Sequence, residues 1–168
     1  MVHKADIERN LRDFDTLYND NRASELYPLY YSKLALLELC GWIETTMDEI
    51  VMNCAKNHLK NRQNVKFVQD EVINRTRGFH YEDNFRGMLV RVMGLVNVER
   101  LEGTLDPTKF HLLKSTLGTL KTSRDTEAHT YVTEATKRID APSKTRVYFT
   151  KVYEGLEEIE RCVKTLRI

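Results

Sequence analysis

The sequence predicts an all-α protein: a single domain over residues 1–168, folded as a bundle of five or six helices. Apolar residues recur at steps of three and four along most of the chain, which is the spacing of one face of an α-helix. No stretch has the sustained apolar–polar alternation of a half-buried strand. Hydrophobic residues make up 41% of the chain and charged residues 30%, a balance that favours a globular domain over a disordered one.

Four apolar stripes in the N-terminal half each predict a helix. The first stripe consists of Ile7, Leu11, Phe14 and Tyr18. The second, longer stripe consists of Leu36, Cys40, Ile43, Met47, Ile50 and Cys54. Pro28 is predicted near the start of this second helix, where its missing N–H does no harm. A short helix, interrupted near Gly78, is predicted from Phe67, Val68, Val72 and Ile73. The fourth stripe consists of Phe85, Met88, Leu89, Val92 and Leu95.

Two further helices are predicted in the C-terminal half. The first begins with Asp106 as N-cap and Pro107 at the first helical position. Its apolar stripe consists of Phe110, Leu113, Leu117 and Leu120. The pattern leaves open whether this helix continues through Arg124 or ends and restarts at Ser123. Beyond a loop predicted at residues 140–143, the last stripe consists of Phe149, Val152, Leu156, Ile159, Val163 and Leu166.

Composition narrows the classes of function. The formal net charge is +1, so any basic surface for nucleic acid would have to be local. No apolar run is long enough to cross a bilayer, and residues 1–6 are polar rather than signal-like. Cys40, Cys54 and Cys162 lie on apolar stripes, which is typical of buried, reduced thiols. We therefore expect a cytoplasmic protein that makes no use of a membrane.

The segment from Arg124 to His129 carries the strongest indication of chemistry. Asp125 and His129 are four residues apart, so on a helix they share a face and can pair. Arg124 and His129 are five apart, about 140° around a regular helix, and do not automatically face the same point. If Ser123 caps a new helix, Arg124 lies in its first turn, where free N–H groups and the helix dipole favour a phosphate.

An earlier segment, from Arg75 to His80, has the same spacing. With 14 arginines and 5 histidines in the chain, about one such match is expected by chance. Gly78 disfavours a helix in this earlier segment, and we expect no carboxylate at helical spacing to pair with His80. The sequence therefore favours the later segment as the functional one.

Arg124-Asp125 followed by His129 resembles the motif of the HEPN superfamily, all-helical domains that include many metal-independent ribonucleases. Tyr131 extends the likeness to Arg-x4-His-x-Tyr, the form found in HEPN toxins that are paired with nucleotidyltransferase antitoxins. The close resemblance covers about eight residues, and the length of the chain resembles larger HEPN domains. It implies an endoribonuclease in a toxin–antitoxin or antiphage-defence setting. It also implies a homodimer in which two motifs face one cleft.

The chemistry that this resemblance implies needs no cofactor or metal. His129 would act as acid or base near neutral pH, Asp125 would orient its ring, and Arg124 would bind the phosphate. Zinc ligation has little support, because no second pair accompanies Cys54 and His58. Glycine-rich phosphate loops and nucleophile elbows are absent from the sequence.

Other interpretations of the same residues remain open. The chain could be a non-catalytic HEPN-like module that binds nucleotide or a protein partner. It could also be a plain helical adaptor, for which we expect a buried His129. Tyr131 is either a packing aromatic, which its helical spacing favours, or a residue that lines the RNA cleft or accepts a nucleotide. The same choice, with packing again favoured over base stacking, applies to a second group of residues: Tyr27, Tyr30 and Tyr31, with Arg22 and Lys33.

Overall fold

The computed structural model describes residues 2–20, 24–132 and 138–166. Within these ranges the chain forms seven α-helices and two short π-helical segments, η1 and η2, and no strand. The all-α prediction is therefore confirmed, but the predicted number of five or six helices is too low. Gly94 accounts for the difference, because its φ of +81° breaks the fourth predicted stripe into two helices.

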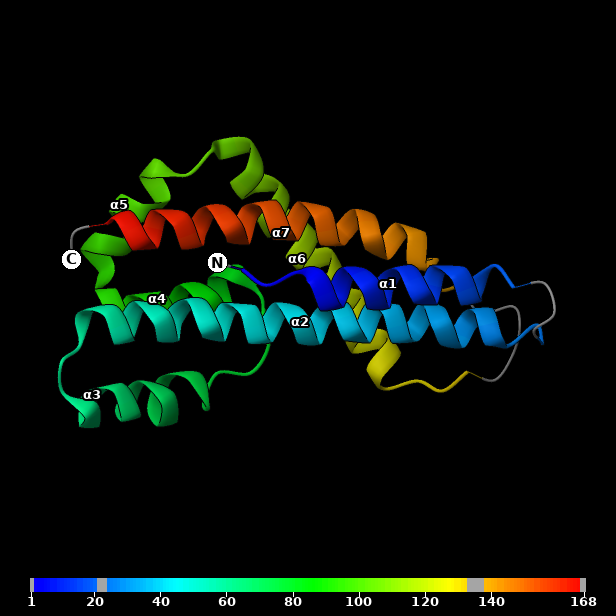
Figure 1. Cartoon of the computed structure of the whole chain (residues 1–168), viewed down its shortest axis with the longest axis horizontal. Helices are drawn as coiled ribbons and strands as arrows, with labels where there is room; N and C mark the ends of the chain where they lie inside the picture. Colours follow the sequence, from blue (N-terminus) through cyan, green and yellow to red (C-terminus); the bar gives the residue numbers. More distant parts are fainter. Residues whose placement is uncertain (1, 21–23, 133–137, 167–168) are drawn as a thin grey trace.

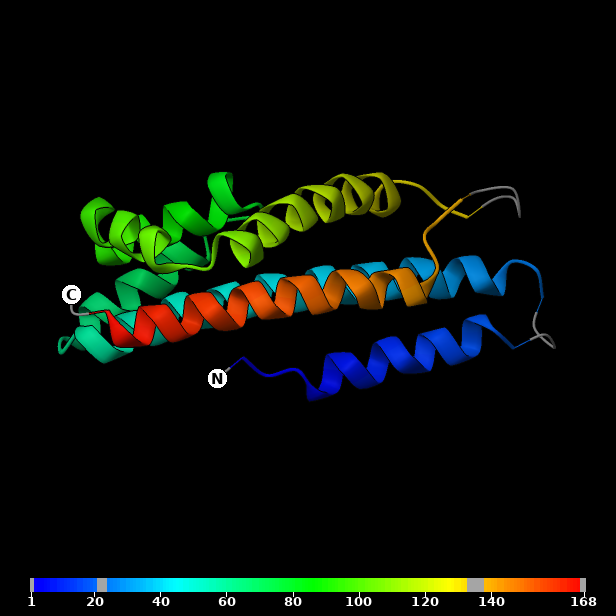
Figure 2. The same ribbon diagram turned by 90° about the horizontal axis from the view of Figure 1, so that it is seen from above.

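Four long helices make the body of the molecule: α1 (Ala5–Tyr18), α2 (Tyr27–His58), α6 (Pro107–Ala128) and α7 (Pro142–Thr165). Helix α2 contacts the other three, and α7 also packs against both α1 and α6. Figures 1 and 2 show the result as three layers, with α1 on one side, α2 and α7 in the middle and α6 on the other side. The end of α6 therefore lies beside the first half of α2.

Short elements gather around one end of this body: α3 (Arg62–Phe67), η1 (Val68–Ile73), η2 (Tyr81–Phe85), α4 (Arg86–Met93) and α5 (Leu95–Thr104). Tyr81 is 1% exposed, and its hydroxyl donates a hydrogen bond to Glu102 on α5 at 2.9 Å. Arg86 donates to the same carboxylate at 2.8 Å. These bonds attach η2 to α5 and so hold the chain segment that precedes η2.

The buried core follows the predicted stripes closely. All six predicted residues of α2 are buried, as are Leu113, Leu117 and Leu120 on α6. Two predicted core residues are wrong, since Phe67 is 61% exposed and Leu95 is 56% exposed. Each stands at the edge of a helix, where the stripe turns away from the core: Phe67 at the junction with η1, and Leu95 directly after Gly94.

Helices α6 and α7 approach each other closely at Gly155. A Cβ placed at this residue would lie 2.7 Å from Cβ of Leu113, so no larger side chain fits without movement. On the other side of the body, the Trp42 indole donates to the carbonyl of His3 at 2.8 Å, and its ring meets Phe149 edge-on at 5.1 Å. Among the described helices, none has both the length and the apolar composition that a membrane span requires.

Candidate functional site

Helix α6 runs without interruption from Pro107 to Ala128. Its N-cap is Asp106, whose carboxylate accepts from the backbone N–H groups of Thr108 (2.8 Å) and Lys109 (2.9 Å), as predicted. Ser123 therefore does not cap a new helix, and Arg124 lies near the end of α6 instead of at a start. The helix dipole is negative at this end, so it favours the arginine itself and gives no help in binding phosphate.

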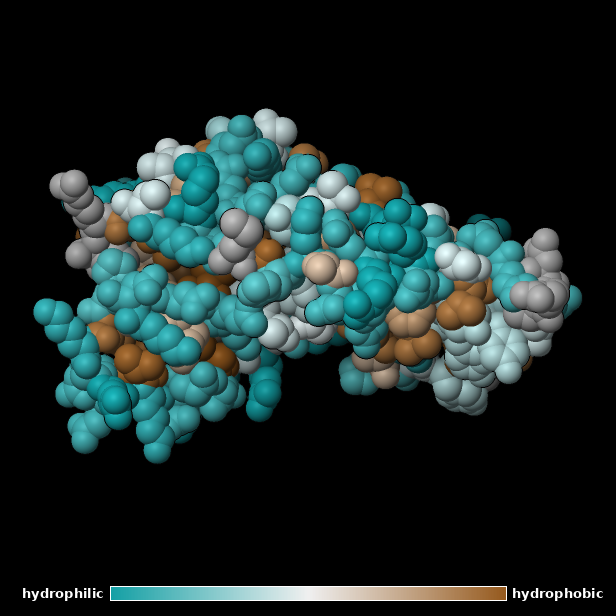
Figure 3. Space-filling model, viewed as in Figure 1, coloured by the Kyte–Doolittle hydropathy of each residue, from teal (hydrophilic) through white to brown (hydrophobic). Residues whose placement is uncertain are grey.

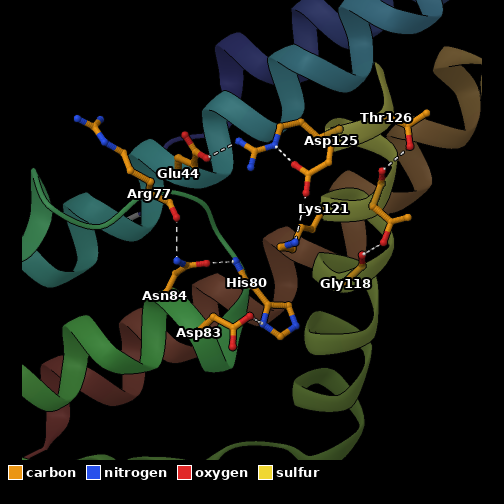
Figure 4. Close-up of polar contacts among 11 residues, drawn as sticks. Glu44, Arg77, His80, Asp83, Asn84, Gly118, Lys121, Asp125 and Thr126 are labelled. Carbon is orange, nitrogen blue, oxygen red and sulfur yellow. Dashed lines mark hydrogen bonds and ion pairs between the residues drawn. The ribbon is translucent and has the colours of Figure 1, made fainter. Parts of the chain in front are cut away.

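The Arg124 side chain is held by groups from three parts of the chain. Its Nη1 donates to Glu44 on α2 at 3.0 Å, and its Nε donates to the neighbouring Asp125 at 3.2 Å. The guanidinium also lies over the ring of Phe79, 5.2 Å from the centroid. Only 29% of the side chain is exposed. The bonds to Glu44 and Asp125, drawn as dashed lines in Figure 4, fix one position for the guanidinium.

One nitrogen of the Arg124 guanidinium, Nη2, makes no hydrogen bond within the described residues. This nitrogen faces Gly78 and would lie 3.8 Å from a Cβ built there. Gly78 has no side chain and a φ of +97°, so the backbone passes close to Nη2 without covering it. Arg124 can therefore offer Nη2 to an anion while its other nitrogens keep their partners.

Asp125 does not pair with His129, contrary to the prediction from their spacing. Its carboxylate contacts Lys121 at 3.2 Å on one side and Arg124 at 3.2 Å on the other. The hydrogen bond from Lys121, aided by the charges of both cations, holds the pKa of Asp125 below its ordinary value. Asp125 pairs toward the preceding turn because His129 is already the C-cap, where the backbone leaves the helix.

His129 and Tyr131 are both exposed to solvent. No hydrogen bond or ion pair to the His129 ring occurs within the described residues, and Tyr131 is 79% exposed. The helical-adaptor expectation of a buried His129 is therefore wrong, and so is packing as the role of Tyr131. The segment is attached to α2 through Lys33, whose ammonium donates to the carbonyl of Thr130.

Part of the predicted tyrosine group is also exposed. Tyr27 is 50% and Tyr30 44% exposed, and Leu34 on the next turn is 44% exposed. The rings of Tyr27 and Tyr30 meet edge-on with centroids 6.5 Å apart, so each tyrosine is partly packed and partly open to solvent. The ring of Tyr27 stacks against Tyr31 with centroids 6.1 Å apart. Arg22, the remaining member of the group, lies outside the described residues. In Figure 3, apolar patches interrupt the hydrophilic surface on this half of the molecule.

The earlier segment, Arg75 to His80, forms a tight connection between η1 and η2. Asn84 bridges it, because its amide donates to the carbonyl of Arg77 (2.8 Å) while its side-chain oxygen accepts from the N–H of His80 (3.0 Å). Nδ1 of His80 is buried and lies 3.0 Å from Oδ2 of Asp83, close enough for an ion pair although not aligned for a hydrogen bond.

The expectation that His80 has no carboxylate partner is therefore wrong. His80 is the residue directly before η2, and one helical turn brings Asp83 back beside it. Arg75 takes no part in this contact, since it pairs with Glu71 at 2.8 Å.

The end of this connection and the start of η2 lie beside α6. At one end Phe79 lies under Arg124, and at the other end Glu82 pairs with Lys114 at 3.3 Å. His80 stands between these two contacts and faces the part of α6 around Gly118 (Figure 4). Thus His80 of the disfavoured segment and Arg124 of the favoured one flank the same stretch of the molecule.

Two groups on α2 near Glu44 have perturbed pKa values. Burial raises the pKa of the Cys40 thiol to about 12, against the opposing effect of Arg124. Burial, followed by the charge of Glu44, raises the pKa of Asp48 to about 6. All three cysteines are buried and unpaired, as predicted. Within the described residues, no group of three or more His, Cys, Asp or Glu side chains is arranged to hold a metal ion.

Sequence reasoning missed Glu44, Phe79 and Asn84. Glu44 is 80 residues from Arg124, and nothing in the local pattern around either residue connects them. For Asn84 the only signal was general, since asparagine side chains often bond to backbone groups a few residues away, as this one does with the N–H of His80. A comparison of the chain with models of known protein families, with curated proteins and with solved structures found no match.

Proposed function

We propose that this chain is a metal-independent endoribonuclease of HEPN type, acting in a toxin–antitoxin or antiphage-defence system. The observation that supports this most is the arrangement at the end of α6. A solvent-facing histidine, His129, follows five residues after a guanidinium that is held in place yet keeps Nη2 available. Exposure suits a residue that must exchange protons with substrate, and a fixed, planar cation suits a phosphate.

The reaction proposed for these groups is attack of the RNA 2′-OH on the adjacent phosphorus. One group removes the 2′-OH proton, another protonates the leaving 5′ oxygen, and Arg124 stabilises charge on the phosphorane. The products are a 2′,3′-cyclic phosphate and a 5′-hydroxyl. His129 is proposed as one of the proton-transfer groups, and Asp125 steadies Arg124 through the 3.2 Å contact instead of orienting His129.

The enzyme is proposed to be a homodimer, so that two copies of the Arg124–His129 set face one cleft. The exposed Tyr27, Tyr30 and Leu34 support this, because such apolar side chains gathered on one helix face favour an interface. Lys33 connects that face to Thr130, next to His129. Light scattering at micromolar concentration is expected to give about twice the chain mass of 19.7 kDa, whereas a strict monomer would refute the shared cleft.

The decisive experiment is cleavage of single-stranded RNA in excess EDTA. Purified protein should cut RNA and leave 2′,3′-cyclic phosphate and 5′-hydroxyl ends, and a DNA strand of the same sequence should resist because it lacks the 2′-OH. The matched control is Arg124→Lys, which keeps the charge and loses the planar fork, and which should cut more slowly. A requirement for Mg²⁺, or equal cleavage of DNA, would contradict this proposal.

A non-catalytic HEPN-like module is the second candidate. One observation favours it: Arg124 already contacts two carboxylates, Glu44 and Asp125, so much of its charge is balanced before any ligand arrives. Such a module would bind nucleotide or a protein, for instance an antitoxin of the nucleotidyltransferase class, with Tyr131 as a contact or modification site. Nucleotide binding measured by calorimetry, together with intact RNA after prolonged incubation, would favour this candidate over the nuclease.

A further inference from the structure

We infer that the basic segment, residues 56–67 at the end of α2 and in α3, binds single-stranded RNA at a surface separate from Arg124 and His129. The inference rests on the proposed function for its ligand, and adds the place where the strand is held beyond the bond that is cut. The first observation is charge. Between residues 56 and 77, six lysines and arginines stand against two carboxylates, a net charge of +4, although the whole chain carries only +1. The basic segment itself contains no Asp or Glu.

The cations of the basic segment are available to phosphates. All four are exposed, and none makes an ion pair or a hydrogen bond within the described residues: Lys56, Lys60, Arg62 and Lys66. Arg124, by contrast, already contacts two carboxylates. Lysines and arginines without carboxylate partners attract a polyanion, and each phosphate that they bind releases counterions from the strand.

The second observation is the way α3 is presented. Asn61 caps the helix by accepting from the N–H of Gln63 at 2.8 Å, and α3 continues into η1, whose Val68 and Val72 are buried. No residue of α3 itself is buried, and hydrophilic side chains project around it at the lower left of Figure 3. Phe67, its last residue, is 61% exposed. An aromatic ring held beside unpaired cations suits the stacking of a base.

The composition of the surface favours RNA over a membrane. A helix that lies on a lipid surface needs a broad apolar face, but α3 has six residues, and Phe67 is the only exposed large hydrophobic residue between 56 and 77. Exposed amide side chains accompany the cations, and amides can hydrogen-bond to the edges of unstacked bases: Asn57, Gln63 and Asn64. Cations, amides and one ring together match the phosphates and bases of a single strand.

The basic segment lies too far from Arg124 to contact the same phosphate. Glu44, which anchors Arg124, and His58 are 14 residues apart on α2, a distance of about 21 Å along the helix. The segment therefore holds nucleotides that flank the cleavage site. Between the two lies Arg77, which is exposed and directly precedes Gly78, and Figure 4 shows its side chain pointing away from the turn beside Arg124.

The proposed homodimer leaves this surface open. The face of Tyr27, Tyr30 and Leu34 lies at the start of α2, whereas the basic segment lies at its end, and a helix of 32 residues is about 48 Å long. Each protomer then carries one basic segment, and a strand that passes through the shared cleft can continue onto it.

The test measures binding without cleavage. The ligand is a 2′-O-methyl RNA strand of about 20 nucleotides, which has no free 2′-OH to attack the phosphate. Fluorescence anisotropy across a range of salt concentrations gives the affinity of the full chain and of the triple variant Lys60→Gln, Arg62→Gln, Lys66→Gln. The variant should bind at least about 10-fold more weakly at about 0.1 M salt. The slope of log affinity against log salt should fall by about 2, because each single-strand phosphate contact contributes about 0.7.

A matched control separates the basic segment from net charge. The triple variant Arg12→Gln, Arg100→Gln, Lys151→Gln removes the same charge from α1, α5 and α7, and should bind within about 2-fold of the unchanged protein. An equal loss of affinity in both triple variants would overturn the inference, because the effect would then belong to the charge of the whole chain.

Phe67 gives an independent check. Phe67→Leu removes the ring and keeps an apolar side chain, so it should weaken binding by about 5-fold or more if a base stacks there. Phe67→Tyr keeps the ring and should bind as the unchanged protein does. Equal binding by Phe67→Leu would remove stacking from the inference.

Cleavage assays distinguish failure of this inference from failure of the proposed function. On the long unmodified strand, the Lys60/Arg62/Lys66 variant should raise KM and leave kcat nearly unchanged, whereas cleavage of a trinucleotide, too short to reach the basic segment, should not change. Binding that depends on the basic segment in a protein that cuts no RNA would refute the nuclease and uphold the inference.

Three results would overturn the inference while leaving the nuclease standing. The first is an unchanged protein that cuts RNA but does not bind the 2′-O-methyl strand. The second is a Lys60/Arg62/Lys66 variant, folded by its melting curve, that binds and cuts the long strand as the unchanged protein does. The third is a loss in this variant of binding to phosphatidylserine vesicles and not to RNA, which would assign the basic segment to a membrane surface.

Discussion

The segments 75–80 and 124–129 share the Arg-x4-His spacing but take up different structures. In the later one, the arginine is anchored by Glu44 and Asp125, and the histidine is exposed without a partner among the described residues. In the earlier one the roles are reversed: Arg75 is a surface side chain paired with Glu71, and His80 is the held residue. Identical spacing therefore leads to different structures: the arginine is held in segment 124–129, and the histidine is held in segment 75–80.

The largest effect is expected at the exposed histidine of the later segment. His129→Ala should reduce RNA cleavage by at least about 100-fold, because a general acid or base contributes about that much or more. Its melting temperature should stay nearly unchanged, since no described contact is lost. Cleavage rates and melting curves measured on one preparation check both expectations. His111→Ala, which also removes an exposed histidine from the α6 region, is the control, and full activity of His129→Ala would rule out its catalytic role.

The next largest effect concerns the backbone of the earlier segment. Gly78→Ala should lower the free energy of unfolding by about 1–3 kcal/mol, because φ is +97° and the new Cβ would lie 3.2 Å from the side-chain oxygen of Asn84. Urea unfolding measures this change. The later segment lies at the end of a regular helix, so Gly118→Ala in α6 should have the opposite sign and add about 0.5–1 kcal/mol. Equal and small effects of the two substitutions would remove this contrast.

A smaller effect is expected at Asp48, which lies one helical turn after Glu44 on α2. Burial and Glu44 raise the pKa of Asp48 from 3.8 in an unperturbed side chain to about 6 in the folded protein. The folded state therefore holds this proton more tightly than the unfolded state, and stability decreases as pH rises from about 4 through about 6. Asp48→Asn should add about 1 kcal/mol at pH 7.5, after allowance for solvent screening, and almost nothing below pH 4. Urea unfolding at both pH values tests this, and a gain that does not depend on pH would contradict it.

The smallest effect is expected at Asp125. Its contact with Lys121 is exposed and its contact with Arg124 is only partly buried, and such ion pairs contribute little to stability. The lowered pKa of Asp125 means that any stabilisation is present at neutral pH and is lost as pH falls through that value. Asp125→Asn should therefore melt near the unchanged protein at pH 7 and lose less activity than Arg124→Lys or His129→Ala. A loss as large as that of His129→Ala would indicate that Asp125 touches the reacting groups.

Local patterns predicted the helices well and the site only in part. Apolar stripes such as that of α2, and N-caps such as Asp106, depend on neighbours within a turn or two, so the sequence alone predicts them. The continuation of α6 through Ser123 could not be predicted, because a serine fits both an N-cap and the face of a helix. The partners of Arg124 were out of reach, since Glu44 and Phe79 come from elements 80 and 45 residues away, which tertiary packing alone brings together.

The position of Trp42 makes its fluorescence a probe of helix packing that is separate from the candidate site. It is the sole tryptophan, and it faces the backbone of His3 and the ring of Phe149, whereas Glu44, two residues later on the same helix, faces Arg124. Its emission should therefore report the docking of α1 and α7 onto α2 and respond little to ligands at the end of α6. The unfolding of each variant described above can therefore be followed by the fluorescence of one residue that none of the substitutions replaces.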